Sequence, residues 1–195
     1  MKILVLNAHP YAKSFCNYLA LAYKEGAIAG GNEVQFVNLR DLKFDPILRK
    51  GYSEITTLEL DLEEQQKLWK WCEHLVIVTP VWWSSYPSLL KGYFDRILLP
   101  GFAYKYHDNK PIPKKLLEGR SARVIYTQNS PKFYTKFLLL DSFWRSLRDG
   151  ILSFCGFKPV ERTFFTEIMK SNEEERKMWI NEVYEIGKVD GTKKK

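Results

Sequence analysis

The stretch "HLVIVTPVWWSSYPSLLKGYFDRIL", residues 74–98, joins an apolar run to an amphipathic helix through a turn that carries two tryptophans. The run at 74–80 is typical of a strand that is buried on both faces of a parallel sheet. A strand followed directly by a helix is the unit from which α/β folds are built. In the helix, apolar residues recur at helical spacing, at Leu89, Leu90, Tyr93, Phe94, Ile97 and Leu98.

The same order of strand and helix repeats along the rest of the chain. Apolar or alternating runs predict strands at 2–7, 33–39, 122–128 and 158–167. Helical spacing predicts further helices at 14–28, 58–73, about 140–151 and 173–186. Because neighbouring parallel strands need a long crossover, this order predicts an α/β fold, a doubly wound five-stranded parallel sheet with helices on both faces.

The ends of these helices carry their own signals. Gly30 and Gly31 predict the end of the first helix, and Gly187 predicts the end of the last. Ser171 or Asn172, each with a glutamate three residues later, predicts the start of the last helix. The fourth helix is predicted from Leu140, Phe143, Trp144, Leu147 and Ile151.

Length and composition limit the kind of protein. The chain has 195 residues, of which 45% are hydrophobic, and we expect a single domain over residues 1–190 with a basic tail at 191–195. The apolar runs are too short to cross a bilayer, and Asn7 and His9 interrupt the first of them. We therefore expect a cytoplasmic protein without direct membrane insertion.

Cysteine spacing and charge exclude further classes. Cys16, Cys72 and Cys155 form no C-x-x-C pair, and we expect neither a disulfide nor a metal. The formal charge of +7 would suit a nucleic-acid binder, whose binding would depend steeply on salt. The basic residues are nevertheless spread among acidic ones, and the run Lys193–Lys195 is terminal. We expect a solvated surface and no nucleic-acid partner.

Three loops follow strands at the edge where ligands bind in such sheets: "NAHPYAKSF", "TPVWWSSYP" and "YTQNSPKFYTK". The first ends at Ser14, at a predicted helix N-terminus that would favour an anion, with Lys13 nearby. Alternatively, Ser14 is only a helix cap and His9 a hydrogen-bonded turn residue. No glycine occurs among residues 1–25, so neither a G-x-G-x-x-G fingerprint nor a P-loop is present.

The second loop raises the question of why Trp82 and Trp83 stand in a turn. A flat aromatic ligand such as an isoalloxazine would give their rings a face to stack on, and the turn amides could bind its polar edge. The alternative is that the two side chains point into a dimer contact or into the core.

Taken together, the three loops show a resemblance to a known family. "HP-x-x-x-SF", "P-x-WW-x-x-x-P-x-x-LKG-x-x-DR" and "GFAY" at 101–104 resemble motifs of the NAD(P)H:quinone oxidoreductase family of flavodoxin-like flavoproteins. That family includes modulator-of-drug-activity and potassium-efflux ancillary proteins. The resemblance implies a flavodoxin-like fold, FMN or FAD as cofactor, NAD(P)H as co-substrate, a quinone-like acceptor, and a homodimer with its active site at the subunit contact.

Site residues are carried over by position. The resemblance assigns the flavin phosphate to His9, Lys13, Ser14, Phe15 and Cys16, although the family usually has Asn where Cys16 stands. It assigns one side of the ring to Pro80, Val81, Trp82, Trp83 and Ser84, with Trp83 as the main stacking residue and the amides of Trp83 and Ser84 facing the N5 and O4 edge.

The third loop departs from the family pattern. Where the family commonly has Thr-Thr-Gly-Gly, this chain has Tyr126, Thr127, Gln128 and Asn129, followed by Ser130. Asn129 can adopt a left-handed conformation more readily than Gln128. The resemblance makes Tyr134 a flavin-binding and catalytic residue, whereas Leu140 replaces a histidine of some members. It also implies that Phe102, Tyr104 and Tyr106 wall the substrate slot.

Two other functions stay open on the sequence. The chain could be a flavin-bearing regulatory subunit of a membrane transport system, or a cofactor-free interaction scaffold, for which the altered third loop is the best argument. For Asp95 and Arg96 we expect a structural role, as a charge pair or a loop anchor.

Overall fold

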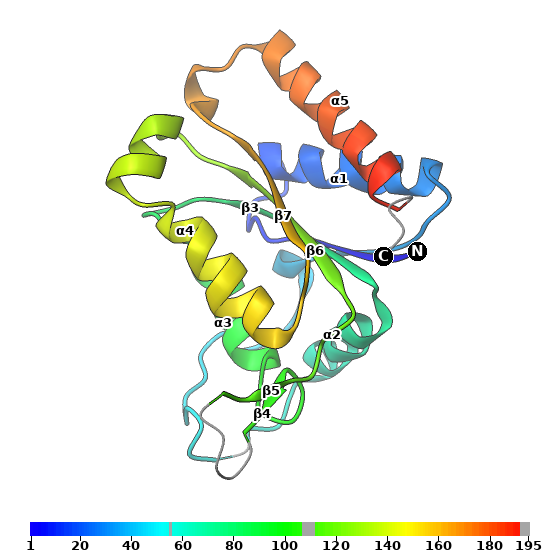
Figure 1. Ribbon diagram of the computed structural model, residues 1–195, viewed down its shortest axis with the longest axis vertical. Coiled ribbons are helices and arrows are strands. Elements are labelled where there is room, and N and C mark those ends of the chain that lie inside the picture. The colour runs from blue at the N-terminus through cyan, green and yellow to red at the C-terminus, as the bar shows by residue number, and fades with distance from the viewer. Residues whose placement is uncertain (55, 107–111, 192–195) are drawn as a thin grey trace.

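The computed structural model describes residues 1–54, 56–106 and 112–191, and a five-stranded parallel sheet forms its centre (Figure 1). The predicted doubly wound sheet is confirmed, and residues 192–195 of the predicted tail lie outside the described residues. The strands are β1 (Lys2–Asn7), β2 (Glu33–Asn38), β3 (His74–Pro80), β6 (Ser121–Thr127) and β7 (Val160–Phe165), in the order β2-β1-β3-β6-β7.

Side-chain alternation along the strands divides the core into two layers (Figure 1). Ile3 and Val5 of β1 belong to one hydrophobic cluster, with helices α1 (Phe15–Ala29) and α5 (Glu173–Asp190). Leu4 and Leu6 belong to the other cluster, which helices α2 (Leu60–Trp71), α3 (Ser88–Ile97) and α4 (Ser142–Arg145) cover. The smaller elements are the 3-10 turns η1 (Leu39–Asp41) and η4 (Ile168–Lys170) and the antiparallel pair β4 (Tyr104–Lys105) and β5 (Lys114–Lys115).

The last helix is longer than predicted. Its start is confirmed, because Asn172 and Glu175 form a capping box, but α5 continues through Gly187 to Asp190. A Cβ at Gly187 would lie 2.4 Å from the carbonyl oxygen of Tyr23 in α1. The prediction that Gly187 ends the helix is therefore wrong, since this glycine allows two helices to pack closely.

The fourth helix is interrupted. It consists of the π-helical segments η2 (Tyr134–Leu138) and η3 (Ser146–Ser153), with α4 between them. Leu140 and Asp141 have φ angles of 50° and 52°, and this left-handed pair separates η2 from α4. Leu140 is consequently 63% exposed, so its predicted place in the core is wrong, whereas Phe143, Trp144 and Leu147 are buried.

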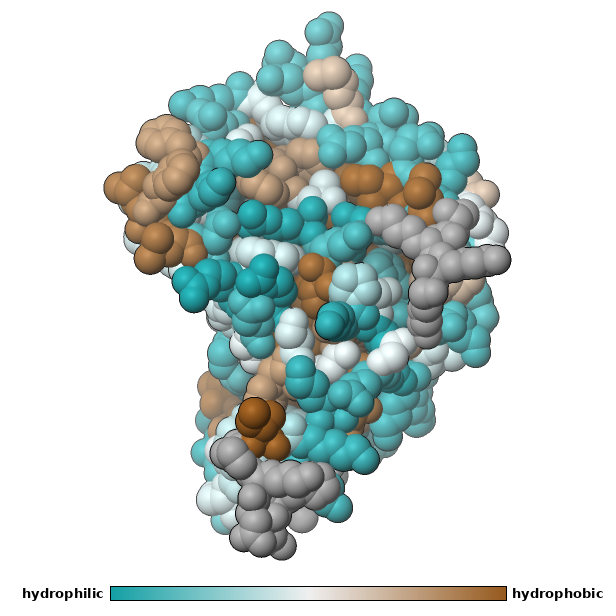
Figure 2. Space-filling view, in the orientation of Figure 1, coloured by the Kyte–Doolittle hydropathy of each residue, from teal (hydrophilic) through white to brown (hydrophobic). Residues whose placement is uncertain are grey.

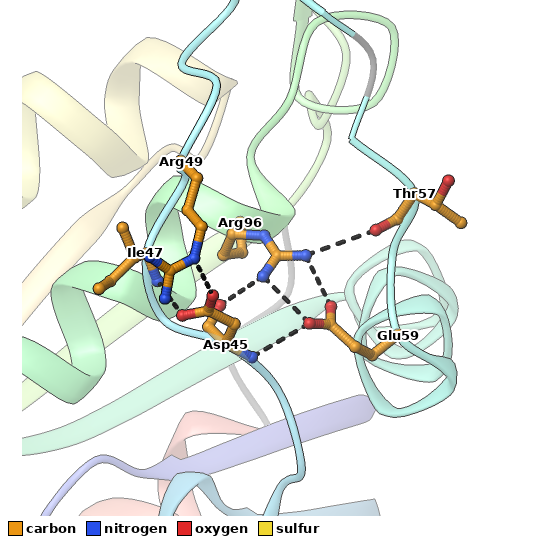
Figure 3. A network of polar contacts seen from close by, with 6 residues as sticks. All are labelled: Asp45, Ile47, Arg49, Thr57, Glu59 and Arg96. Atoms are coloured by element: carbon orange, nitrogen blue, oxygen red, sulfur yellow. Dashed lines mark hydrogen bonds and ion pairs between the residues drawn. The ribbon is translucent and has the colours of Figure 1, made fainter.

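Arg96 of α3 holds the segment at residues 42–59 against the helix (Figure 3). Its guanidinium donates to the carbonyl oxygen of Asp45 and to both carboxylate oxygens of Glu59, with an Nη2–Oε2 distance of 2.6 Å. Although burial alone would raise the pKa of Glu59, hydrogen bonds from the Asp45 amide and from Arg96 lower it. The predicted role of Arg96 as a loop anchor is confirmed.

The rest of the L-K-G-x-x-D-R motif has a similar explanation. A Cβ at Gly92 would lie 2.4 Å from Cβ of Pro46, so the glycine lets the segment cross α3 closely. Asp95 accepts an ion pair from Lys91 one turn earlier, with an Nζ–Oδ2 distance of 2.6 Å. The motif thus serves the fold and lies on the helix that follows the tryptophan turn.

Candidate functional site

The three loops meet at the carboxyl edge of the sheet, where the strand order reverses between β1 and β3. The Ala8 N–H donates to Val78 O at 2.8 Å, and the Val81 N–H donates to Thr127 O at 2.8 Å. These bonds continue the sheet by one residue on each side and bring the loops together.

Two adjoining cavities lie among these loops. The α1-side cavity has a volume of about 260 Å³, and the predicted residues that line it are His9, Ser14, Phe15, Cys16, Pro80, Val81, Trp82, Thr127, Gln128 and Asn129. The η2-side cavity has a volume of about 350 Å³, and the predicted residues that line it are Val81, Trp83, Ser84, Gln128, Asn129, Ser130 and Tyr134. Lys13 is exposed and is not part of the lining of either cavity.

Sequence reasoning missed the contribution of the loop after β7. Ile168 and Met169 of η4 line the α1-side cavity, and Met169 is 81% exposed. Thr135, Leu139 and Phe143 were likewise missed on the η2 side. The rule that places ligands at the carboxyl ends of strands would have included the β7 loop, although no motif marks it.

Ser14 begins α1 and faces the α1-side cavity. Its Oγ accepts a hydrogen bond from the Asn17 N–H at 3.2 Å, so its predicted role as a helix cap is confirmed. Its own hydroxyl hydrogen is still available for a ligand. The first turn of α1 contains no acidic residue, so the positive end of the helix dipole has no nearby side-chain counter-charge there.

His9 is half-buried beside this helix end. Its Nδ1 accepts a hydrogen bond from the Tyr11 N–H at 3.0 Å, which places the proton of the neutral ring on Nε2. Burial and then the charge of Arg40 lower the pKa of His9, so the ring is neutral at pH 7 and presents an N–H donor. The ring meets Trp82 edge-on, with 5.5 Å between centroids.

Cys16 links the first and third loops. Its Sγ lies 3.3 Å from Oγ1 of Thr127, and the side chain is 1% exposed. Burial raises the pKa of Cys16 to about 12, so the group is a neutral thiol at pH 7. It can therefore act as a weak hydrogen-bonding group in the wall of the cavity but not as a nucleophile.

The tryptophan turn is a tight reversal. Trp82 and Ser85 exchange backbone hydrogen bonds of 2.8 and 2.9 Å across it, and Trp83 and Ser84 between them have φ angles of 53° and 55°. Such angles are costly for residues with a Cβ and tend to be kept at functional sites. Trp83 is 99% exposed, so the alternative that it points into the core is excluded.

The amides of this turn are available to a ligand. Within the described part of the chain, no backbone acceptor takes a hydrogen bond from the N–H of Trp83 or Ser84, and both residues line the η2-side cavity. Two donors at one cavity edge suit a ligand with carbonyl or ring-nitrogen acceptors.

The third loop is fixed by side chains. Neither Gln128 nor Asn129 is among the described residues with a positive φ, so the left-handed conformation considered for Asn129 does not occur. Asn129 Oδ1 instead accepts from the Met169 N–H at 3.1 Å, which joins this loop to η4. Tyr134, the first residue of η2, is 40% exposed at the η2-side cavity.

The predicted substrate residues lie elsewhere in the single chain. Tyr104 and Tyr106 line a third cavity of about 460 Å³ between α3, η3 and the β4 strand, together with Tyr52 and Tyr86. Burial, with smaller effects from Tyr52 and Tyr106, raises the pKa of Tyr104 to about 12. Phe102 is buried in the core, so its interpretation as a packing residue fits best.

Two general absences concern the described residues alone. None of their helices combines the length and apolar character that a bilayer crossing requires. No three His, Cys, Asp or Glu side chains among residues 1–54, 56–106 and 112–191 come together as metal ligands would.

Comparisons with known proteins agree with this geometry. Residues 1–187 match the model of a family described as having a flavodoxin-like fold. The human ribosyldihydronicotinamide dehydrogenase [quinone] is 35% identical over 207 residues, which cover 90% of this chain and 86% of that protein. An uncharacterized NAD(P)H oxidoreductase of Haemophilus influenzae is 29% identical over 188 residues, covering 92% and 91%.

Solved structures show the same architecture. The protein Smu.1420 of Streptococcus mutans superposes with a TM-score of 0.83 at 29% identity, covering 96% of this chain and 99% of that one. An FMN-dependent NADH-azoreductase of Bacillus anthracis, in complex with FMN, superposes with a TM-score of 0.77 at 20% identity, covering 98% and 99%, which shows a shared fold. The chain belongs to the NAD(P)H:quinone oxidoreductase family of flavodoxin-like proteins.

Proposed function

We propose that this protein is a flavin-dependent oxidoreductase that takes hydride from NAD(P)H and delivers it to a quinone or a similar acceptor. The observation that carries the proposal is the pair of adjoining cavities at the reversal of strand order, lined by all three predicted loops. The quinone reductases among its relatives support the acceptor class.

The residues present fit a flavin. The α1-side cavity offers an uncapped positive helix end, the Ser14 hydroxyl and the His9 Nε2–H, which suit a phosphate. The η2-side cavity offers the amides of Trp83 and Ser84, which suit the polar edge of a ring. We favour FMN over FAD because the two cavities account for a phosphate and a ring, and because a protein of the same fold binds FMN.

A bound flavin would supply the hydride chemistry, by accepting hydride from a nicotinamide and passing it to the acceptor. The protein's own groups would hold and orient it. His9 and Ser14 would bind the phosphate, and the turn amides would fix the ring plane. The Tyr134 hydroxyl, at the mouth of the η2-side cavity, is the group that we propose to donate a hydrogen bond to ring or acceptor oxygens.

We further propose a homodimer. Four exposed apolar side chains gather in and beside η2: Phe133, Phe137, Leu138 and Leu140. Figure 2 shows hydrophobic side chains concentrated over this segment, which lies between β6 and α4 in Figure 1. A second copy that covers this apolar surface would also shield Trp83, and could bring its own aromatic loop at 101–106 to the slot.

The same surface keeps one alternative open. If its occupant is a membrane transport protein and not a second copy, the chain would act as a regulatory subunit. We place the protein in the cytoplasm as one domain over residues 1–190, in keeping with three buried unpaired cysteines.

The visible absorption spectrum of the purified protein tests the proposal. We expect bands at about 370 and about 450 nm, after incubation with FMN if the protein is purified without it, which bleach when NADPH is added without oxygen. A protein that binds neither FMN nor FAD would contradict the proposal and favour the scaffold hypothesis.

A further inference from the structure

Gln128 stands in the wall that the two cavities share and is 5% exposed. Its side-chain nitrogen Nε2 donates to the carbonyl oxygen of Ser130 at 3.1 Å and to Oγ1 of Thr135 at 2.7 Å. Both hydrogens of the amide are therefore used within the loop.

The partners fix which way this amide points. The Ser130 carbonyl can only accept a hydrogen bond. The Thr135 hydroxyl donates its single hydrogen to Pro131 O at 3.3 Å, so it must accept from Gln128. A flipped amide would set its oxygen against two acceptors, which leaves one orientation.

The side-chain oxygen Oε1 is then the remaining polar atom of Gln128. Among the hydrogen bonds of the described residues, none has this oxygen as its acceptor, although the residue is almost fully buried. A buried acceptor without a donor is costly, and a ligand N–H that meets it would recover that cost. Gln128 thus offers an acceptor where the family commonly has glycine.

We propose that Gln128 Oε1 accepts a hydrogen bond from the imide N3–H of the flavin ring and thereby selects for a ring with an N–H at that position. The inference rests on the proposed flavin function. The imide edge of an isoalloxazine carries one N–H between two carbonyl oxygens, so one fixed acceptor in a wall otherwise rich in donors matches it. Thr135 is a positioning residue, because it holds the amide in this orientation.

The test compares the affinity of the protein for FMN with its affinity for FMN methylated at N3, measured by fluorescence titration. We expect the wild type to bind FMN about tenfold more tightly than the methylated form, as the loss of one buried hydrogen bond predicts. Gln128→Met keeps the side-chain volume but removes the oxygen. We expect it to bind FMN about tenfold less tightly and to discriminate between the two flavins by less than about twofold.

The outcomes separate this inference from the flavin proposal. If Gln128→Met still discriminates as the wild type does, the methyl group is excluded by shape alone and the inference is overturned. If the wild type binds neither flavin, the proposed function fails and the inference fails with it.

Thr135 provides a second pair of variants in case Gln128→Met does not fold. Thr135→Val removes the hydroxyl that orients the amide, and we expect discrimination to fall about threefold, whereas Thr135→Ser keeps it. Equal discrimination in both variants would overturn the inference. Near-ultraviolet circular dichroism checks that each variant is folded.

Discussion

Ser14 and Asn172 hold the same position at the start of two helices, but only Ser14 borders a cavity. Each accepts a hydrogen bond from a backbone N–H two or three residues into its helix. The pair therefore separates the effect of a lost cap from the effect of a lost ligand donor.

We expect Ser14→Ala and Asn172→Ala each to lower the free energy of unfolding by about 1 kcal/mol, which urea unfolding measures. Only Ser14→Ala should also weaken FMN binding, by about tenfold, because only it removes a hydroxyl from the proposed phosphate site. Equal FMN affinity in the two variants would argue against a phosphate at α1.

At this scale the sequence predicted more identities than contacts. The lining residues followed from their motif positions, since loops after β1, β3 and β6 must meet at one edge. The unpartnered oxygen of Gln128 could not be predicted, because it depends on Thr135 as acceptor and on Pro131 in turn. Tyr104 and Tyr106 lie in a different cavity for a similar reason: their place depends on packing against α3 and η3.

At the scale of elements, α1 and α5 meet through two glycines. Gly26 faces the carbonyl of Tyr184, to which a Cβ would come within 1.9 Å, and Gly187 faces the carbonyl of Tyr23. A glycine near the end of a periodic run can mark a helix end or a close crossing. The sequence cannot separate these uses, because the second depends on a partner helix that lies far away in the chain.

Other elements followed from periodicity alone. All five strands were predicted within two residues of their ends, since buried runs of strand length between helical patterns leave few alternatives. The break at Leu140 and Asp141 was not predicted, because two consecutive left-handed residues without glycine leave no signal in hydrophobic spacing.

We expect Gly187→Ala to lower the free energy of unfolding by about 2 kcal/mol or more, since the methyl group would force α5 away from α1. Gly150→Ala is the matched control. A Cβ there has nothing within 4 Å, so the substitution should be neutral or stabilising by up to about 1 kcal/mol. Thermal and urea unfolding measure both, and equal effects would show that the close crossing does not limit stability.

At the scale of the whole molecule, Asp190 ties the end of the chain to the sheet and to α1. Its carboxylate accepts from Arg123 Nε at 2.5 Å and from the Tyr23 hydroxyl at 2.9 Å. Burial alone would raise the pKa of Asp190, but Arg123 and, to a smaller degree, His74 lower it.

This pairing predicts how stability depends on pH. A carboxylate with a lowered pKa stabilises the fold fully above its unfolded value of 3.8, and the contribution is lost as the pH falls through its folded value. We expect Asp190→Asn to cost about 3 kcal/mol at pH 7, because Arg123 would stay buried without its counter-charge. Urea unfolding at pH 7, 5 and 3 should show the difference between the variant and the wild type shrinking at the lowest pH. A constant difference would assign the stability to packing.

The proposed homodimer is also tested at this scale. Phe137 is 68% exposed on η2, and Met178 is 62% exposed on α5. We expect Phe137→Asp to yield monomers, and Met178→Asp to leave dimers intact, because a charge disrupts an apolar interface only where one exists. Light scattering after size-exclusion chromatography measures both, and an unchanged mass for Phe137→Asp would place the contact elsewhere.

The exposed indole of Trp83 gives the molecule an intrinsic optical reporter. Buried indoles such as that of Trp69 emit at shorter wavelengths than an indole in water, so this side chain should dominate the long-wavelength edge of the emission. A flavin beside it would quench that edge, whereas a covering subunit would shift it to the blue. The two events at the turn can thus be followed separately in one unlabelled sample, with Trp83→Phe as the blank.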